Sequence, residues 1–304
     1  MDITLTQLRY FTETAARLSM TGAAENLHTT QSAVSTAIAK LERRIGQSLF
    51  IRHHAKGLQL TPTGELFLMK ARGILEQLEE AVETAQREQR TIRGRVRFAC
   101  YRTLTPFLLP GILARLRNDY PALDVDVIET DAKGCIEALL QGRADLALMY
   151  DMGGIPESVT TLAVSSIRPY VALPLTHPLA GRAAVSLREM NGFPFILLDL
   201  PNTPELMNSI WKTANLQPEV TFRSADFETV RTFVANGHGY AILHQRPRHT
   251  LTYDGAEVAT VEIIDDVPLL PVVLAALSTT RQTARAQAII AAVQQQIATI
   301  PGMS

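Results

Sequence analysis

The 304-residue sequence has few of the features that mark secreted or membrane proteins. It contains only two cysteines, Cys100 and Cys135, and two cysteines in a chain of this length do not make a disulfide framework. Its first residues lack the cationic start and the apolar core of a signal peptide. No run approaches the roughly 20 consecutive apolar residues of a membrane helix. We therefore expect a soluble, cytoplasmic protein that has no membrane partner.

Motifs for catalysis, nucleotide binding and metal binding are also missing. The sequence has no P-loop, no G-x-G-x-x-G, no G-x-S-x-G and no cluster of metal ligands. The adjacent His53 and His54 have no Cys, Asp or third His nearby at ligand spacing, so a solvated turn explains them better than a metal site. We expect a protein that is not an enzyme and that holds no metal and no resident cofactor.

An overall excess of basic charge is absent too, but the charge is uneven along the chain. The formal net charge is -1, whereas residues 1–60 contain seven Lys and Arg against four Asp and Glu, an excess of +3. Because one small module can bind nucleic acid while the rest of a chain is acidic, the global balance does not exclude DNA binding. Hydrophobic residues make up 46% of the sequence, which is enough for complete cores.

Apolar residues at helical spacing predict three helices before Gly46, which would end the third. Thr6, Thr21 and Thr30 are positioned to cap them. The predicted buried positions are Leu8, Phe11, Ala15 and Leu18, then Ala23, Ala24 and Leu27, then Val34, Ile38, Leu41 and Ile45. The short connection before the third helix fits a helix-turn-helix. On spacing alone, an ordinary three-helix domain with a solvated face remains an alternative.

The outer face of the third predicted helix is suited to DNA. Short polar side chains let a helix approach the major groove, Gln can pair with an adenine edge, and a helix N-terminus favours phosphate. The predicted DNA-binding residues of this helix are Thr30, Gln31, Ser32, Ser35, Thr36 and Lys40. A hairpin with strands at 49–52 and 58–60 follows, as a wing would. Arg52 and Lys56 at its tip are predicted to contact the minor groove or phosphates.

Thr61 and Pro62 predict the start of a long helix. Its apolar residues recur at heptad spacing: Phe67, Ala71, Ile74, Leu78, Ala81 and Ala85. This seam favours a dimerisation helix, and docking onto its own domain remains the alternative. A dimer would present two recognition helices to two half-sites.

The remaining residues predict two α/β units. Strands at 95–101, 124–129 and 146–150 alternate with helices, and strands at 195–198, 219–223 and 240–243 repeat the pattern. Segments 168–173 and 272–277 are predicted strands that cross between the units, and a helix from 281 to about 299 ends the chain. Two such units joined by two crossings form a two-lobed domain with a cleft at the strand ends.

Residues at strand ends and helix starts are the candidates for lining that cleft. They are Tyr101, Arg102, Thr103, Tyr150, Asp151, Pro169, Tyr170, Asp199, Leu200, Phe227 and His244. The aromatic residues predict an apolar pocket, while Arg102, Thr103 and the helix N-termini predict a ligand carboxylate. We therefore expect a small organic acid, with or without an aromatic ring, as the ligand. For each residue taken alone, ordinary packing or exposure is the alternative. Cys100 and Cys135 could form a redox switch, but their apolar surroundings favour buried structural thiols.

The stretch LRYFTETAARLSMTGAAENLHTTQSAVSTAIAKLERRIGQSLFIRHHAKGLQLTPTGELF, residues 8–67, closely resembles the DNA-binding domain of LysR-type transcriptional regulators. The AAENL helix, the QSAVS start, the LE…IG…LF…R run and the LTPTGE exit occur in the family's order. The resemblance implies that Gln31, Ser32, Ser35 and Arg52 meet double-stranded DNA. It also implies a homotetramer built as a dimer of dimers, RNA polymerase as a partner, and effector control through lobe closure.

The last 200 residues resemble the family's effector domain more diffusely, through LLP at 108–110, GRADLAL at 142–148, HPLAG at 177–181 and VANGHGYAIL at 234–243. Two positions depart from the family, which commonly has a small hydroxyl residue at Tyr101 and proline at Gln245. The expected fold class is α+β multidomain: a winged helix-turn-helix (1–60), a linker helix (61–90) and an effector domain (91–304) like type 2 periplasmic binding proteins. Its lobes would span 94–164 with 269–304, and 165–268. A solute-binding protein or an α/β enzyme is the alternative function.

Overall fold

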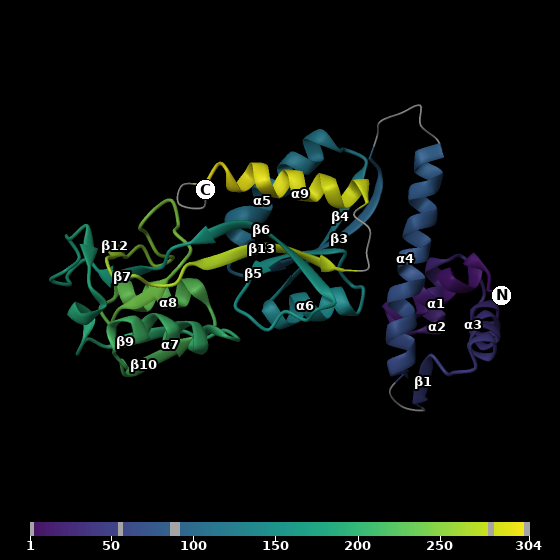
Figure 1. The fold of residues 1–304 in the computed structure, drawn as a ribbon, viewed down its shortest axis with the longest axis horizontal. Helices are drawn as coiled ribbons and strands as arrows, with labels where there is room; N and C mark the ends of the chain where they lie inside the picture. The colour runs from purple at the N-terminus through teal and green to yellow at the C-terminus, as the bar shows by residue number, and fades with distance from the viewer. Residues whose placement is uncertain (1–2, 54–56, 86–91, 279–282, 301–304) are drawn as a thin grey trace.

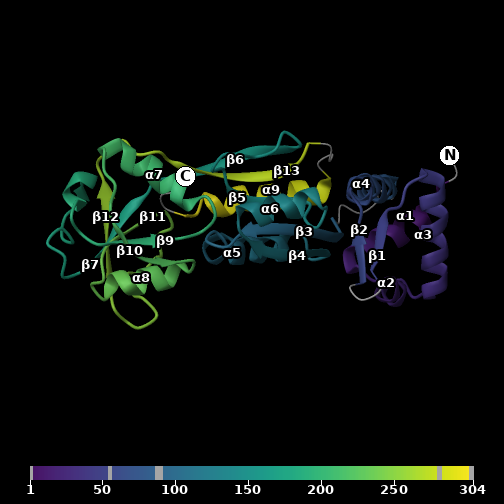
Figure 2. The ribbon, with the colours of Figure 1, turned by 90° about the horizontal axis from the view of Figure 1, so that it is seen from below.

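A computed structural model describes residues 3–53, 57–85, 92–278 and 283–300. A small helical unit with a two-stranded hairpin lies at one end, an elongated α/β part lies at the other, and one long helix stands between them (Figures 1 and 2). Within the described ranges, no helix has the length and apolar character needed to cross a membrane.

The N-terminal unit has the predicted three helices and hairpin. Its elements are α1 (Leu5–Arg17), α2 (Met20–Asn26), α3 (Gln31–Ile45), β1 (Phe50–His53), β2 (Gly57–Leu60) and the long helix α4 (Pro62–Ala85). Thr30 caps α3 and Gly46, with φ of 74°, ends it, as predicted. The predicted caps Thr6 and Thr21 are wrong, because Thr4 caps α1 and Ser19 caps α2. At Thr4 the Gln7 side chain completes a capping box, which satisfies two helix-end donors at once.

The helix α4 closes the core of the N-terminal unit. The Phe11 ring lies 5.4 Å from Phe50 of the hairpin and 5.3 Å from Phe67 of α4, centroid to centroid. Ala71 is fully buried in the same core, whereas Ile74 is 48% exposed. The predicted heptad seam is therefore divided. Its first positions, Phe67 and Ala71, pack onto their own domain, whereas the side chains of Ile74 and Ala81 are exposed.

The first α/β unit is a five-stranded sheet in the order β4-β3-β5-β13-β6. The strands are β3 (Gly94–Tyr101), β4 (Leu123–Thr130), β5 (Leu146–Tyr150), β6 (Val159–Ile167) and β13 (Leu270–Leu277). Its helices are α5 (Thr105–Asp119) and α9 (Ala284–Ile297) on one face and α6 (Ala132–Leu140) on the other (Figure 1). The predicted βαβαβ order is confirmed for β3 to β5. The strand β6 was not predicted, because its Thr- and Ser-rich sequence does not alternate.

The second α/β unit contains a four-stranded sheet, β11-β7-β12-β8, and the parallel pair β10-β9. Its elements are β7 (Tyr170–Pro174), β8 (Ala184–Val185), β9 (Phe195–Leu198), α7 (Thr203–Ala214), β10 (Val220–Ser224), α8 (Phe227–Ala235), β11 (Ala241–Leu243), β12 (Val258–Ile263) and a 3-10 turn at Leu187–Met190. A backbone bridge between Phe195 and Tyr240 joins the two sheets. The long strand β13 runs back into the first unit, so the chain crosses between the units twice, as predicted.

Candidate functional site

The predicted recognition residues share the outer face of α3. The buried side of this helix is anchored by Val34, Ile38 and Leu41, all fully enclosed. The Thr30 Oγ1 accepts a hydrogen bond from the Ala33 amide at 3.2 Å and so caps the first turn. On the opposite face, the exposed residues are Thr30, Gln31, Ser32, Thr36 and Lys40, and Ser35 is partly exposed. An exposed row of short hydrogen-bonding side chains can read base edges and bind phosphates.

The hairpin is fixed relative to α3 by one carboxylate. The Glu42 Oε1 accepts hydrogen bonds from the amides of Leu49 at 2.7 Å and Phe50 at 3.2 Å. The Thr61 hydroxyl donates to the Ser48 carbonyl at 2.7 Å and closes the same end of the hairpin, where Phe50 pairs with Leu60. Arg52 lies in β1, opposite Leu58. Its side chain lies outside the described residues, as does all of Lys56.

A cavity of about 40 Å³ lies between the two α/β units. Six of the predicted cleft residues line it: Tyr101, Thr103, Tyr150, Leu200, Phe227 and His244. The other lining residues are Met152, Leu198, Thr203, Leu206, Met207, Ile242, Leu243, Gln245 and Leu270. At about 10 to 15 Å³ for one water, the cavity has room for about three water molecules, far less than the several hundred Å³ of a typical ligand site. The cleft is therefore closed in this conformation.

A hydrogen-bond bridge holds the two units together across the cavity. The Tyr150 hydroxyl, at the end of β5, accepts from Thr103 Oγ1 at 3.2 Å and from Gln245 Nε2 at 2.8 Å. Gln245 follows β11 in the other unit, and its carbonyl accepts from the Tyr170 hydroxyl at 2.9 Å. The Tyr101 ring packs edge-on against Tyr150, with centroids 4.8 Å apart. Burial raises the pKa of Tyr150 to about 12, so its hydroxyl stays neutral at physiological pH.

His244 contributes a polar atom without a partner to this cavity. Its Nε2 is buried and has no hydrogen-bond partner among the described residues. Loss of hydration on burial lowers the pKa of His244 to about 4, because burial disfavours the charged imidazolium. The imidazole is therefore neutral near pH 7 and offers a lone pair or an N–H, according to its tautomer.

The depressed pKa of His244 predicts a loss of stability in acid. An unfolded histidine takes up its proton near pH 6.5, whereas the folded one resists protonation down to about 4. This contribution to stability is complete above about pH 6.5 and is lost as the pH falls towards 4, by up to about 3 kcal/mol. Urea unfolding at pH 7 and pH 4.5 should show a smaller loss for His244→Gln than for the wild type. The exposed His249→Gln is the matched control; equal losses in all three proteins would contradict the prediction.

Five predicted cleft residues do not line the cavity. Arg102 is exposed, Asp151 accepts a hydrogen bond from the Gly153 amide, and Asp199 pairs with Arg223 at 3.4 Å. Pro169 and Tyr170 are buried, with Tyr170 behind Gln245.

Sequence reasoning missed Thr203 and Gln245, which both line the cavity. Thr203 is the first residue of α7, just as Phe227 is the first residue of α8. The same reasoning from helix starts that selected Phe227 would therefore have selected Thr203. Gln245 directly follows His244, beyond the last predicted strand. The sequence marks it only as a position where the family commonly has proline, so nothing in the sequence predicts its place in the cavity.

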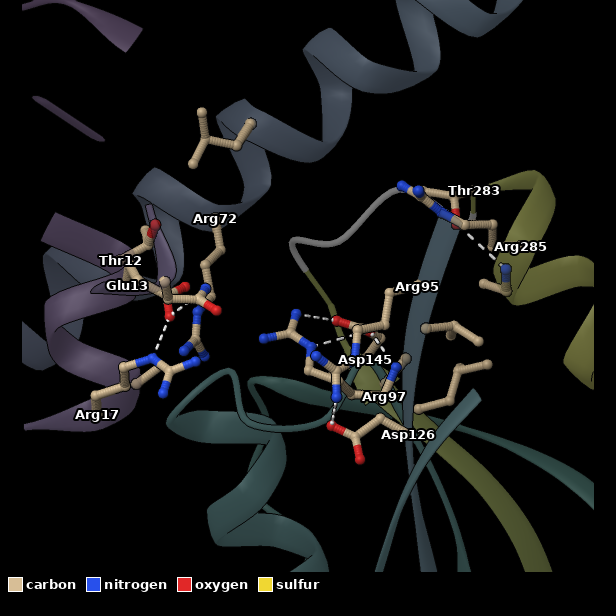
Figure 3. A pocket seen from close by; sticks show the side chains of 17 residues that line it. Thr12, Glu13, Arg17, Arg72, Arg95, Arg97, Asp126, Asp145, Thr283 and Arg285 are labelled. Atoms are coloured by element: carbon tan, nitrogen blue, oxygen red, sulfur yellow. Dashed lines mark hydrogen bonds and ion pairs between the residues drawn. The ribbon is translucent and has the colours of Figure 1, made fainter. Parts of the chain in front are cut away.

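A larger cavity of about 650 Å³ lies between α1 and α4 on one side and the strand ends of the five-stranded sheet with the start of α9 on the other (Figure 3). Its charged side chains are largely matched in pairs: Arg17 with Glu13, Arg95 with Asp126, and Arg97 with Asp145. Arg72 of α4 donates to the Gln141 carbonyl at 2.8 Å and so joins the long helix to the end of α6. We interpret this region as the joint between the two parts of the chain.

The two thiols are enclosed in the protein interior. Cys100 and Cys135 are fully buried and form no disulfide. Burial raises the pKa of Cys100 to about 11 and that of Cys135 to about 12. The reactive species of a cysteine is its thiolate, so these values favour structural thiols over a redox switch. Among the described residues, no group of three His, Cys, Asp or Glu side chains could hold a metal ion.

Both the N-terminal part and the α/β part of the chain match models of known protein families. Residues 5–65 match the family model "Bacterial regulatory helix-turn-helix protein, lysR family", and residues 89–298 match "LysR substrate binding domain". The uncharacterized HTH-type transcriptional regulator YybE of Bacillus subtilis is 30% identical over 78% of this chain and 81% of its own length. A probable hydrogen peroxide-inducible genes activator of Streptomyces viridosporus is 27% identical, over 98% of this chain and 95% of its own.

Solved structures show the same architecture. HinK, a LysR family transcriptional regulator from Pseudomonas aeruginosa, superposes with a TM-score of 0.65 at 31% identity and covers 97% of this chain and 98% of its own. A full-length OxyR from the same organism has a TM-score of 0.79 at 23% identity, with 96% and 98% coverage. The second likeness concerns the fold alone.

Proposed function

The chain belongs to the LysR family of bacterial transcriptional regulators, and from this premise we propose that it reads DNA through α3 under the control of a small molecule in the inter-lobe cleft. The family supplies a DNA-binding helix-turn-helix and a substrate-binding effector domain. The observation that carries the proposal is the exposed polar face of α3, held against the hairpin by Glu42. We assign regulation rather than catalysis to the protein.

The proposed division of labour follows the predicted boundaries. Residues 1–60 would bind double-stranded DNA, 61–90 would connect and dimerise, and 91–304 would bind the effector, with lobes at 94–164 plus 269–304 and at 165–268. The DNA contacts would come from Thr30, Gln31, Ser32, Ser35, Thr36 and Lys40, with Arg52 and Lys56 from the hairpin. RNA polymerase is the further partner that the family resemblance implies.

Oligomerisation is proposed through the open side of α4. Ile74 is 48% exposed and Val82 47%, and with the exposed Ala81 they fall within about 100° of the helix circumference. Such a stripe of apolar side chains is a surface that a second helix would cover. A dimer built on it would carry two copies of α3, and two dimers would give the proposed homotetramer.

The effector is proposed to bind where the two lobes meet. The side chains there come from both lobes, so a molecule that binds among them would change the free energy of lobe closure. The Arg72 contact with Gln141 gives a route from the lobe to the long helix. The sequence alone predicts a small organic acid as this effector, but Arg102, on which that charge depends, is exposed and does not line the cavity.

Replacement of Gln31 by alanine tests the DNA-binding proposal. An exposed Gln that pairs with one base edge should contribute about 1–3 kcal/mol of discrimination against the wrong base. Fluorescence anisotropy with DNA from upstream of this gene should show weaker specific binding by Gln31→Ala and nearly unchanged binding to unrelated DNA at low salt. The exposed Gln217→Ala, in the effector domain, is the matched control. Failure of the wild type to bind any upstream DNA, even at low salt, would contradict the proposed function.

A further inference from the structure

The cavity between the lobes contains hydrogen-bonding groups but no cationic side chain. Among the described residues that line it, none is Lys or Arg, and its single basic group, His244, is neutral near pH 7. The polar side chains that line it are the hydroxyl-bearing Tyr101, Thr103, Tyr150 and Thr203, the amide Gln245 and the imidazole of His244. Leucine, isoleucine, methionine and phenylalanine side chains form most of the remaining wall.

We propose that the ligand of this cleft is a small neutral molecule with an apolar or aromatic body and one amide or hydroxyl group, which takes the place of the Tyr150 hydroxyl on Gln245. The inference rests on the proposed function, because it specifies the effector of the same cleft. A buried carboxylate without a countercharge costs several kcal/mol, whereas a neutral amide needs only hydrogen-bond partners.

The helix ends at the cavity do not replace the missing cation. Three helices begin beside it: α5 just after Thr103, α7 at Thr203 and α8 at Phe227. The first turns of α5 and α7 each contain a proline, which removes a backbone donor. The first turn of α7 also carries Glu205. At α8 the Asp226 carboxylate already accepts from the Thr229 amide at 2.7 Å.

The volume of the cavity shows what the ligand must displace. At about 40 Å³, it holds no organic molecule until the lobes separate or Tyr150 moves. Either change breaks the 2.8 Å bond from Gln245 Nε2 to the Tyr150 hydroxyl. Movement of Tyr150 leaves both Gln245 Nε2 and Thr103 Oγ1 without this acceptor, whereas lobe separation frees Gln245 alone, because Thr103 and Tyr150 lie in the same unit. In either case a ligand oxygen restores the lost hydrogen bonds. The group that Tyr150 presents to Gln245 and Thr103 is a neutral oxygen at the edge of an aromatic ring, which is the chemistry we assign to the ligand.

The test uses the full-length chain and matched pairs of probes. Isothermal titration calorimetry at pH 7 compares each amide with its own acid: benzamide with benzoate, salicylamide with salicylate, and nicotinamide with nicotinate. We expect every amide that binds to do so about 10-fold more tightly than its acid, with an affinity that is flat between pH 6 and 8. An acid that binds as tightly as its amide overturns the proposal, and so does the failure of all three amides to bind.

Two variants show whether the bound amide uses the Tyr150 site. Tyr150→Phe leaves the ring in place and frees Gln245 and Thr103, so the amide should bind about 5- to 10-fold more tightly. Gln245→Leu should weaken it by a similar factor, and the exposed Gln217→Leu should not change it. Weaker binding by Tyr150→Phe overturns the displacement of its hydroxyl. Anisotropy with upstream DNA on the same preparations separates the two levels: loss of DNA binding rejects the proposed function, and intact DNA binding with a failed amide test rejects this inference alone.

Discussion

Substitution of Gly64 by alanine is expected to abolish specific DNA binding while the effector domain keeps its stability. A Cβ built at Gly64, in the first turn of α4, lies 2.1 Å from the Leu49 carbonyl oxygen, a backbone atom that cannot rotate away. The same carbonyl accepts the Thr61 amide at 3.0 Å where the hairpin enters α4. The clash therefore separates the hairpin from the long helix. We expect a loss of about 3 kcal/mol or more from the winged unit, the upper end of overpacking effects.

The same helix provides a matched control for this prediction. Gly73 also lies in α4, and a Cβ there meets nothing within 4 Å. Gly73→Ala should be neutral or stabilising by up to about 1 kcal/mol, because alanine favours the helix. The single tryptophan, Trp211, lies in α7 and reports on the effector domain during urea unfolding. Gly64→Ala should lose DNA binding with an unchanged Trp211 transition; DNA binding equal to that of Gly73→Ala would refute the clash.

Most of the helices and the hairpin of the N-terminal unit were predictable, because local sequence determines where they begin and end. Apolar spacing correctly predicted Val34, Ile38 and Leu41 as buried in α3, although Ile45 is only partly buried, and Thr30 and Gly46 correctly predicted its ends. Capping failed at Thr6 and Thr21, since the competing Thr4 and Ser19 lie only two residues earlier and spacing does not separate such neighbours. The division of the α4 seam also escaped prediction. Phe67 packs on its own domain because the fold brings the Phe11 ring beside it, and this tertiary contact cannot be derived from the spacing of apolar residues in α4.

The cleft was less predictable, since its composition depends on which strand ends meet. The expectation that residues at strand ends line the cleft is confirmed for Tyr101, Tyr150 and His244. The sequence could not indicate that the Arg102 side chain is exposed to solvent. The ligand carboxylate expected from Arg102 thereby loses its cation. Gln245 belongs to the bridge because the two units meet and bring its Nε2 within 2.8 Å of the Tyr150 hydroxyl, which lies far away in the sequence. The strands β6 and β12 were missed for a related reason, as their pairing with distant strands overrides weak local preference.

Replacement of Arg231 by methionine is the second large effect that we expect, and it acts on the other half of the chain. Arg231 is buried in α8, where its Nη1 pairs with Glu228 at 2.5 Å and its Nη2 donates to the carbonyls of Thr250 and Leu251, both at 3.1 Å. Glu228 in turn accepts from the Tyr253 amide at 2.9 Å. The ion pair thus ties the segment that follows Gln245 to the start of α8, beside the cleft residue Phe227.

Removal of one member of a buried ion pair leaves the other charge without compensation and costs about 3–5 kcal/mol. The Trp211 transition of Arg231→Met should therefore move to lower urea by more than about 1 M. Arg182→Met is the matched control, because Arg182 and Glu189 form a similar pair with side chains 55% and 36% exposed. An exposed pair is worth about 0–1 kcal/mol, so the control transition should barely shift.

The two large predictions together test whether DNA reading and effector sensing reside in separable parts of the chain. The Arg231 contacts all lie within the second α/β unit, and none of them involves α1 to α4. Arg231→Met should therefore lower the stability reported by Trp211 and still bind upstream DNA at low temperature, the reverse of Gly64→Ala. Loss of both properties in both variants would mean that the two parts unfold as one unit. In that case the joint formed by Arg72 and Gln141 would be rigid rather than a point of regulated movement.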